Sequence, residues 1–202
     1  MRILVAADTL FGERGFDGVS VRDVAERAGV NKALVFYYYK SKVALFETVV
    51  QRYYDGHRAA LEAAFATGGS IRERLHRLMD AYVDYIDEHR GFPRLMQRRV
   101  AGTTGADTEL VQRGLAPLLE WTERALDEVT PALGPLAARH FFLTFSGAVI
   151  HFFTFGAVIE PMWGVDPLSA DGVAERRAHL HWLVDAVLDG LKRDAVAATE
   201  PE

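Results

Sequence analysis

Apolar residues recur along the chain at the three- and four-residue spacing of amphipathic α-helices, and no stretch shows the sustained alternation of a β-strand. Glycine and proline clusters separate the helical segments, as expected where helices end. The pattern therefore predicts an all-α fold, with a loop at about 101–107. Predicted helices begin at about Ile3 and after Asn31, and cover about 20–28, 43–66, 70–89, 93–100, 108–129, 136–159 and 170–193.

Residues 20–42, SVRDVAERAGVNKALVFYYYKSK, predict two short helices joined by a tight turn. Ser20 is placed to cap the first helix, and Asp23 stands at the second position of a capping box. Gly29 follows that helix, where a positive φ is easily adopted, and Asn31 is a good N-cap for the next one. The second helix is rich in tyrosine and lysine, which suits a helix that enters the major groove of DNA. The segment therefore predicts a helix-turn-helix.

The segment Phe36–Lys42, FYYYKSK, resembles the Tyr-Tyr-His-Phe-x-Ser-Lys signature of the tetracycline-repressor (TetR) family of bacterial transcriptional regulators. The similarity covers residues 2–47. Its upstream stretches are Ile3–Leu10, Phe11–Phe16, Val21–Ala25 and Ala28–Val30. The resemblance implies an N-terminal three-helix bundle with the helix-turn-helix over residues 1–46. It also implies a larger helical domain over residues 47–202 that binds an effector and dimerises.

Backbone contacts with DNA are assigned to four of these residues. Ser20 lies at a helix N-terminus, whose free N–H groups suit a phosphate. Tyr37, Tyr38 and Lys42 match family positions that contact the DNA backbone, so the resemblance implies this role for them. Such contacts position a protein on DNA without reading its sequence.

Base contacts would come from side chains that can reach the major groove, as donors to guanine or as apolar partners of thymine methyls. These candidates are Arg22, Lys32, Ala33 and Leu34. Leu34 replaces a Ser or Thr that is frequent in the family, and Phe36 replaces a Tyr, so the operator sequence is not predicted. Phe36 can equally be a core residue between the two short helices. The predicted DNA-binding residues are Ser20, Arg22, Asn31, Lys32, Ala33, Leu34, Phe36, Tyr37, Tyr38 and Lys42.

Charge is distributed unevenly along the 202 residues, whose formal net charge is −5. Residues 1–50 carry seven Lys or Arg and six Asp or Glu, a net of +1, whereas the remainder carries 16 and 22, a net of −6. The excess acid therefore lies outside the predicted DNA-binding domain. Phosphate contact needs only a few local cations, although the same cations would also suit a merely solvated helix.

Composition limits what kind of core, cross-link and metal site the chain can have. Half of the residues are hydrophobic, enough for a sizeable core. The chain has no cysteine, which excludes disulfides and thiolate metal sites. No signal-peptide pattern is visible, and we expect a cytoplasmic protein.

Residues 141–159 form a 19-residue run whose only ionisable side chain is His151. Its length permits a transmembrane span, but it lacks flanking basic or aromatic belts. A helix that is apolar on all sides can equally be buried in a bundle, and we favour this interpretation. The resemblance implies that the last two long helices pair with their copies in a homodimer. A dimer would hold two DNA-reading helices one DNA turn (~34–36 Å) or a multiple of it apart, as a palindrome requires.

A narrow strip of polar and small residues runs along the same predicted helix. Its members are His140, Thr144, Gly147, His151 and Thr154. One hypothesis places His151 and Thr154 at the wall of an effector cavity. The other, which we favour, places the strip in the dimer seam or against a polar neighbour.

The family resemblance implies that the C-terminal domain binds a small inducer. Its large apolar and aromatic side chains, Tyr85 among them, favour a hydrophobic or aromatic effector, although such residues can equally form plain core. The predicted effector-binding residues are Met79, Tyr82, Met96, Trp121, Thr144, Phe145, His151, Phe152 and Thr154.

No motif for catalysis is visible: the chain lacks a phosphate-binding glycine-rich loop, a Gly-x-Ser-x-Gly elbow and a His-Glu-x-x-His sequence. Glu73 and His76 match the Glu-x-x-His of di-iron bundles, but a second copy is missing. We therefore predict no enzyme, no cofactor and no metal. The predicted function is a ligand-responsive regulator, a repressor by the family's commoner outcome, released from DNA by a hydrophobic small molecule. A helical bundle enzyme and a membrane-associated helical protein are the alternatives.

Overall fold

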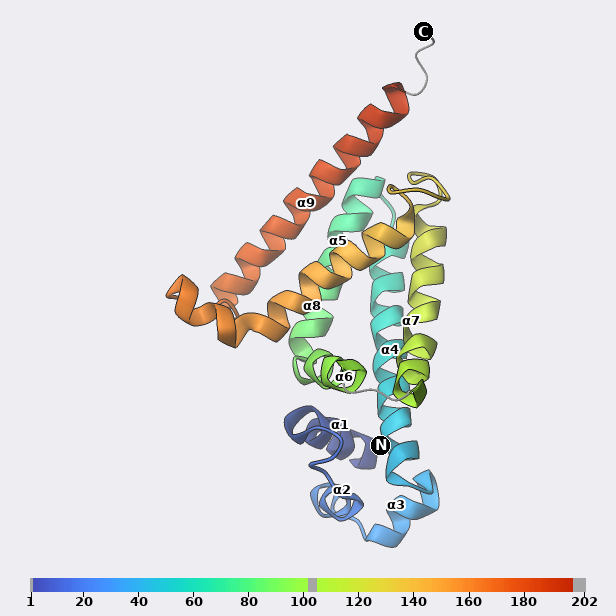
Figure 1. Ribbon diagram of the computed structural model, residues 1–202, viewed down its shortest axis with the longest axis vertical. Helices are drawn as coiled ribbons and strands as arrows, with labels where there is room; N and C mark the ends of the chain where they lie inside the picture. The colour runs from blue at the N-terminus through green and yellow to red at the C-terminus, as the bar shows by residue number, and fades with distance from the viewer. Residues whose placement is uncertain (1, 102–104, 198–202) are drawn as a thin grey trace. The chain divides into compact units, whose positions relative to one another are not determined.

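The computed structural model describes residues 2–101 and 105–197, with side chains for 2–97 and 108–193. Over these residues the chain forms nine α-helices and no strand, which confirms the predicted all-α fold (Figure 1). The helices form two compact units. The first comprises residues 1–56 and 89–116, and the second comprises residues 57–88 and 117–202.

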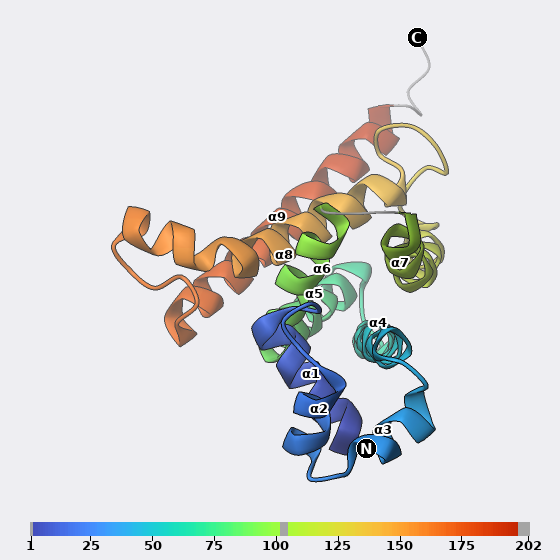
Figure 2. The same ribbon diagram turned by 60° about the horizontal axis from the view of Figure 1, so that its bottom comes forward.

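The first unit contains the helix-turn-helix and the helices that support it, and α1, α2 and α3 lie beside the first half of α4 (Figure 2). Its helices are α1 (Arg2–Arg14), α2 (Val21–Ala28), α3 (Lys32–Tyr39), the first half of α4 (Lys42–Ala66), α6 (Gly91–Ala101) and the start of α7 (Gly105–Leu126). Phe11 and Phe46 are fully buried and meet edge to face, with ring centroids 5.2 Å apart. Phe16 packs on Phe46 at 4.9 Å. This aromatic cluster buries apolar surface between α1 and α4 and so anchors the DNA-binding helices.

Local capping forms the helix-turn-helix as predicted. The Ser20 hydroxyl accepts a hydrogen bond from the Asp23 N–H at 3.2 Å, and the Asp23 carboxylate accepts one from the Ser20 N–H at 2.7 Å. This is the expected capping box. Gly29 ends α2 with a φ of 65°, and the Asn31 side chain accepts from the Leu34 N–H at 2.7 Å.

A pair of glycines lies where α6 packs on α1. A Cβ atom added to Gly91 would lie 3.1 Å from the Cα of Gly12. Carbon atoms prefer separations of about 3.5–4.0 Å, so a larger residue at position 91 would push the two helices apart. The close approach of the backbones therefore requires glycine at this position.

The second unit contains the C-terminal helices and the helices they pack on. Its members are the second half of α4, α5 (Ile71–Glu88), the second half of α7, α8 (Ala138–Trp163) and α9 (Ala170–Ala197). The α5 helix packs against both α8 and α9. Ile86 of α5, Phe153 of α8 and Leu180 of α9 are fully buried and belong to the core.

A reciprocal polar network joins α5 to α9. Asp80 of α5 lies 2.8 Å from Nε2 of His181 and accepts a hydrogen bond from Arg177 at 3.1 Å. The His181 ring stacks on the ring of His76, with centroids 4.3 Å apart and planes 1° apart. A second set has the helices exchanged and consists of Asp185 on α9 with His76 and Arg72 on α5. Each of the two carboxylates thus faces one guanidinium and one imidazole.

Several predicted helix limits are wrong. The structure starts α6 at Gly91 and α7 at Gly105, so the predicted loop at 101–107 is helical at 101 and at 105–107, while residues 102–104 lie outside the described part. α7 ends at Leu126, three residues before the predicted Val129, and the N–H groups of Val129 and Thr130 both donate to the Leu126 carbonyl in the turn that follows.

The last two helices also differ from the prediction. The α8 helix begins at Ala138 and continues through Pro161 to Trp163 instead of ending at Ile159. Gly164, with a φ of 73°, ends it, because glycine adopts the left-handed conformation that closes a helix at little cost. α9 continues to Ala197, beyond the predicted end at Arg193.

Candidate DNA interface and effector domain

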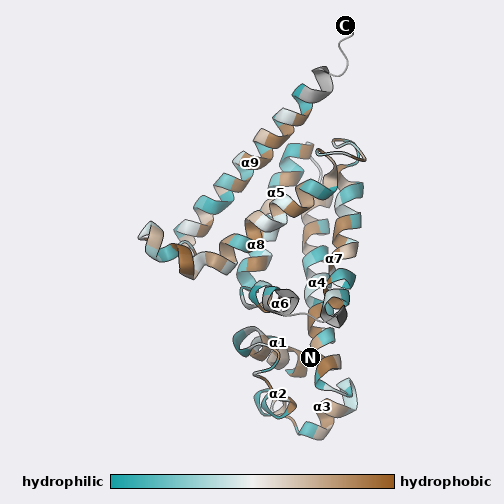
Figure 3. Cartoon of the chain, in the orientation of Figure 1, coloured by the Kyte–Doolittle hydropathy of each residue, from teal (hydrophilic) through white to brown (hydrophobic). Residues whose placement is uncertain are grey.

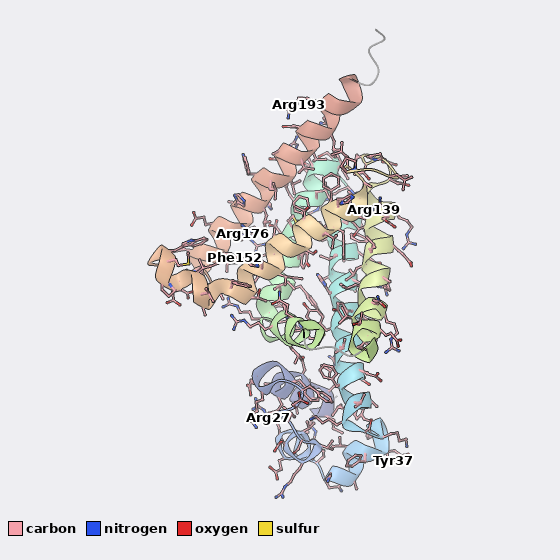
Figure 4. The ribbon with its side chains drawn as sticks, viewed as in Figure 1. Arg27, Tyr37, Arg139, Phe152, Arg176 and Arg193 are labelled. Carbon is pink, nitrogen blue, oxygen red and sulfur yellow. The ribbon has the colours of Figure 1, made fainter. Side chains whose placement is uncertain are left out.

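The α3 helix exposes nearly all of its side chains. The buried residue of α3 is Val35, which is 1% exposed. It attaches the helix to the rest of the unit. Tyr37 and Tyr38 are 69% and 62% exposed, and Figure 4 shows Tyr37 on the outer side of α3. Asn31, Lys32, Ala33, Leu34 and Phe36 are exposed as well. Exposed aromatic side chains gathered on one short helix are typical of a binding surface.

Lysines lie over the aromatic rings of this surface. The Lys32 ammonium is 5.5 Å from the centre of the Phe36 ring, and the Lys40 ammonium is 5.7 Å from that of Tyr37. Cations within about 6 Å of a ring centre are attracted by its negative face. Phe36 is 39% exposed, so it takes part in this surface and is not a fully buried core residue.

Arg22 is held by a neighbour on its own helix. Its Nε donates to Glu26 at 2.9 Å, and this hydrogen bond raises the pKa of the Arg22 guanidinium. Both side chains are well exposed. This bond uses one of the five N–H donors of the guanidinium, so the terminal N–H groups of Arg22 can donate to a guanine while Nε stays paired with Glu26.

Ser20 and Lys42 are also engaged within the fold. Ser20 caps α2 and is exposed, and its N–H lowers the pKa of Asp23 by hydrogen bonding to the carboxylate. The Lys42 ammonium lies 4.2 Å from the centre of the Phe16 ring. Ser41 caps α4, because its hydroxyl accepts from the Ala44 N–H at 3.0 Å.

The predicted effector-binding residues do not share one environment. Within the second unit, Met79, Tyr82 and Phe152 are buried, and Trp121, Phe145 and Thr154 are half-buried. Met96 is buried in the first unit. Thr144 and His151 are exposed on α8.

The polar strip of α8 lies mostly on its solvent side. His140, Thr144, Gly147 and His151 are exposed, and a Cβ atom on Gly147 would meet nothing within 4 Å. The Thr154 hydroxyl donates to the Ile150 carbonyl at 2.9 Å. Within one chain the strip therefore borders open space along most of its length.

Large apolar side chains accompany this strip. They are Leu143, Phe155, Val158, Met162 and Trp163 on α8 and Trp182 on α9, and we call this set the outer face. Figure 3 shows how much of α8 is hydrophobic. Among the described helices α8 has the length and composition of a membrane span, yet only 22% of its most apolar window is buried.

Two residues of interest were absent from the predicted site. His57 is buried, and its ring lies 4.6 Å from that of Tyr82 and 5.0 Å from that of Tyr85. Its sequence neighbours Gly56 and Arg58 give no sign of this burial. Lys40 belongs to the exposed surface of α3 and could have been found from its place beside the tyrosines.

The described side chains contain no group of three His, Cys, Asp or Glu suited to an ion. Glu73, of the Glu-x-x-His match, instead caps α5. Its carboxylate accepts from the Ser70 N–H at 2.8 Å.

A capped helix-turn-helix that exposes its second helix defines a DNA-binding protein of the helix-turn-helix class. Residues 3–49 match the model of the bacterial regulatory proteins of the tetR family. This match places the DNA-binding part of the chain in the TetR family of transcriptional regulators.

Known relatives are regulators as well. The chain is 37% identical over 101 residues to YttP of Bacillus subtilis, named as a probable HTH-type transcriptional regulator, with 49% of each chain covered. It is 28% identical over 173 residues to the HTH-type transcriptional regulator RutR of Escherichia coli, with 80% of this chain and 77% of RutR covered. The chain thus spans about half the length of YttP.

Among solved structures, FadR of Bacillus subtilis in complex with stearoyl-CoA superposes with a TM-score of 0.69. The identity is 16%, and 95% of this chain and 96% of FadR are covered. At this identity the likeness shows a shared fold.

Proposed function

We propose that the protein is a cytoplasmic transcriptional repressor that binds a palindromic operator as a homodimer and is released by a hydrophobic small molecule. The observation that carries the proposal is the exposed α3 surface, where Tyr37, Tyr38 and Lys32 lie free of the core. Such a helix can enter the major groove while its hydroxyl and ammonium groups contact phosphates. The residues assigned to the interface are those predicted from the sequence.

The outer face of α8 and α9 supports the homodimer. Leu143, Val158 and Trp182 are each more than half exposed, and burying such side chains against a second copy is favourable by about 25 cal/mol per Å². Gly147 leaves room for another helix to approach α8 closely. The polar strip would then lie in the dimer seam.

Buried aromatic groups in the second unit support a hydrophobic effector. Tyr82 and Phe152 belong to its core, and His57 adds a ring between α4 and α5. FadR, which shares the fold, was solved with an acyl-CoA whose tail is apolar. The effector must prefer one arrangement of the two DNA-reading heads while DNA prefers another, since otherwise it could not release the operator.

A gel-shift assay on DNA flanking the protein's own coding region tests the proposal, with light scattering to measure the mass. We expect a dimer without detergent, a shift that unlabelled heparin does not abolish, and release by long-chain fatty acids or their CoA esters from a panel of apolar compounds. A monomer without preference for any duplex over heparin would overturn the proposal. A chain that stays in solution only with detergent would favour the membrane-associated alternative.

His151→Leu separates the two hypotheses for the polar strip. Because His151 is exposed and stacks on Phe155 at 4.0 Å, we expect this variant to keep its effector affinity. A large loss of effector affinity with an unchanged dimer would place His151 at the cavity wall.

A further inference from the structure

The turn between α3 and α4 holds a lysine in a conformation that lysine rarely adopts. Lys40 has a φ of 58° and a ψ of −39°, and it is the one non-glycine residue with positive φ in the described chain. The Ser41 N–H donates to the Tyr39 carbonyl at 2.5 Å, across Lys40. A bond of this kind closes a γ-turn, and the form with positive φ is rare and strained.

Hydrogen bonds on both sides determine this turn. The Lys40 N–H donates to the Phe36 carbonyl at 3.0 Å and closes α3. The Ser41 carbonyl and hydroxyl accept from the N–H groups of Leu45 and Ala44 and open α4. Since only Lys40 and Ser41 separate the two helices, the strain cannot relax without displacing one of them. Strained residues held in this way cluster at functional sites.

Glycine would adopt this conformation without the clash of a side chain. The presence of lysine here therefore indicates that its side chain has a role of its own. Lys40 is exposed, and its ammonium lies over the ring of Tyr37. No described carboxylate is within ion-pair distance of it. Arg22, by contrast, is paired with Glu26.

We propose that Lys40 contacts a DNA phosphate and that the strained turn holds its ammonium over the ring of Tyr37, on the exposed side of α3. The inference rests on the proposed DNA binding by α3 and adds a residue to it. Lys40 and Tyr37 together would contact the DNA backbone at the C-terminal end of α3, and Lys32 would lie at the N-terminal end. The contact positions the protein and does not read bases.

Substitutions that separate charge from strain test the inference. Lys40→Gln removes the charge and keeps the strain, Lys40→Gly removes both, and Lys40→Arg keeps both. Lys192→Gln, at an exposed site on α9, is the control for the loss of one cation. Binding to the duplex that flanks the coding region is measured by fluorescence anisotropy over a salt series, and thermal unfolding is followed for each variant.

One phosphate contact contributes about 0.9 to the slope of log K against log salt, and a dimer carries two copies of Lys40. We therefore expect Lys40→Gln and Lys40→Gly to lower the slope by about 1.8 and the affinity at about 0.1 M salt by at least tenfold. Lys40→Arg and Lys192→Gln should keep the slope. Lys40→Gly should unfold at a higher temperature than Lys40→Gln, because the strain is relieved.

An unchanged salt slope in both uncharged variants, with DNA still bound, would overturn the assignment and leave Lys40 a purely structural residue. If Lys40→Gln does not fold, Lys40→Gly alone decides. If the unaltered protein shows no salt-dependent binding, the proposed function itself fails, and the role of Lys40 fails with it.

Discussion

Val35 and Tyr37 lie two positions apart on α3 and have opposite surroundings. Val35 is 1% exposed, whereas Tyr37 is 69% exposed. We expect Val35→Ala to lower the free energy of unfolding by about 1–3 kcal/mol, because it leaves a void under the helix. Tyr37→Phe keeps the ring and should leave stability within about 0.5 kcal/mol while weakening DNA binding through the lost hydroxyl. Urea unfolding and gel-shift titration of both variants would show whether stability and DNA affinity separate in this way; equal effects of both substitutions on unfolding would contradict the assignment.

Tyr54 is a buried phenol in the first unit. Burial raises the pKa of Tyr54 to about 12, from an ordinary value near 10. Below about pH 10 the phenol is neutral in both the folded and the unfolded chain. Above that pH the unfolded chain loses the proton first, so stability falls as pH rises from about 10 to 12, by about 2–3 kcal/mol.

Chemical unfolding at a series of alkaline pH values measures this loss, and Tyr54→Phe is the matched control because it has no phenol to ionise. The pH dependence should be weaker in the variant by about the stated amount. An identical dependence in both proteins would show that Tyr54 ionises as readily in the folded chain as in the unfolded one.

At the scale of elements, the contact between α5 and α9 depends on Asp80 more than on Asp84. Asp80 faces both Arg177 and His181, whereas Asp84 is 63% exposed and pairs with Arg177. We expect Asp80→Asn to lower the free energy of unfolding by about 1–2 kcal/mol and Asp84→Asn by less than about 0.5 kcal/mol. Thermal unfolding of the two variants measures both losses, and a larger effect of Asp84→Asn would contradict the greater importance of Asp80 for the contact between α5 and α9.

Local signals explain which elements the sequence could predict. Ser20, Gly29 and Asn31 act on residues within one turn of themselves, so the limits of α2 and α3 follow from sequence. The limits of α6 and α8 do not. Gly91 begins α6 where it packs against Gly12 of α1, and that contact is remote in sequence.

The residues of the candidate site likewise fall into those that the sequence could predict and those that it could not. The exposed face of α3 follows from its content of tyrosine and lysine, whose polar groups favour contact with water. The ion pair of Arg22 with Glu26, the turn at Lys40 and the burial of His57 depend on side-chain and backbone geometry that helical periodicity does not specify. Effector residues are the hardest to assign, because apolar spacing is the same for a cavity wall, a core and a dimer seam.

For the molecule as a whole, the outer face decides whether two DNA-reading heads act together. Val158 of α8 is 60% exposed within that face, and Val5 of α1 is similarly exposed, at 55%, without belonging to it. We expect Val158→Glu to dissociate the proposed dimer, because association would bury an unpaired charge. Val5→Glu should leave the mass unchanged.

A monomer offers one recognition helix to a palindrome that presents two half-sites, so Val158→Glu should also lose operator affinity by at least tenfold, while its helix content stays that of the unaltered chain. Light scattering, circular dichroism and gel-shift titration measure the three quantities on the same samples. If Val158→Glu remained a dimer and bound the operator as before, the second copy would have to be held by a different surface. The polar strip of α8 would then be left facing water, and the exposed run of Leu143, Phe155 and Met162 would need another partner.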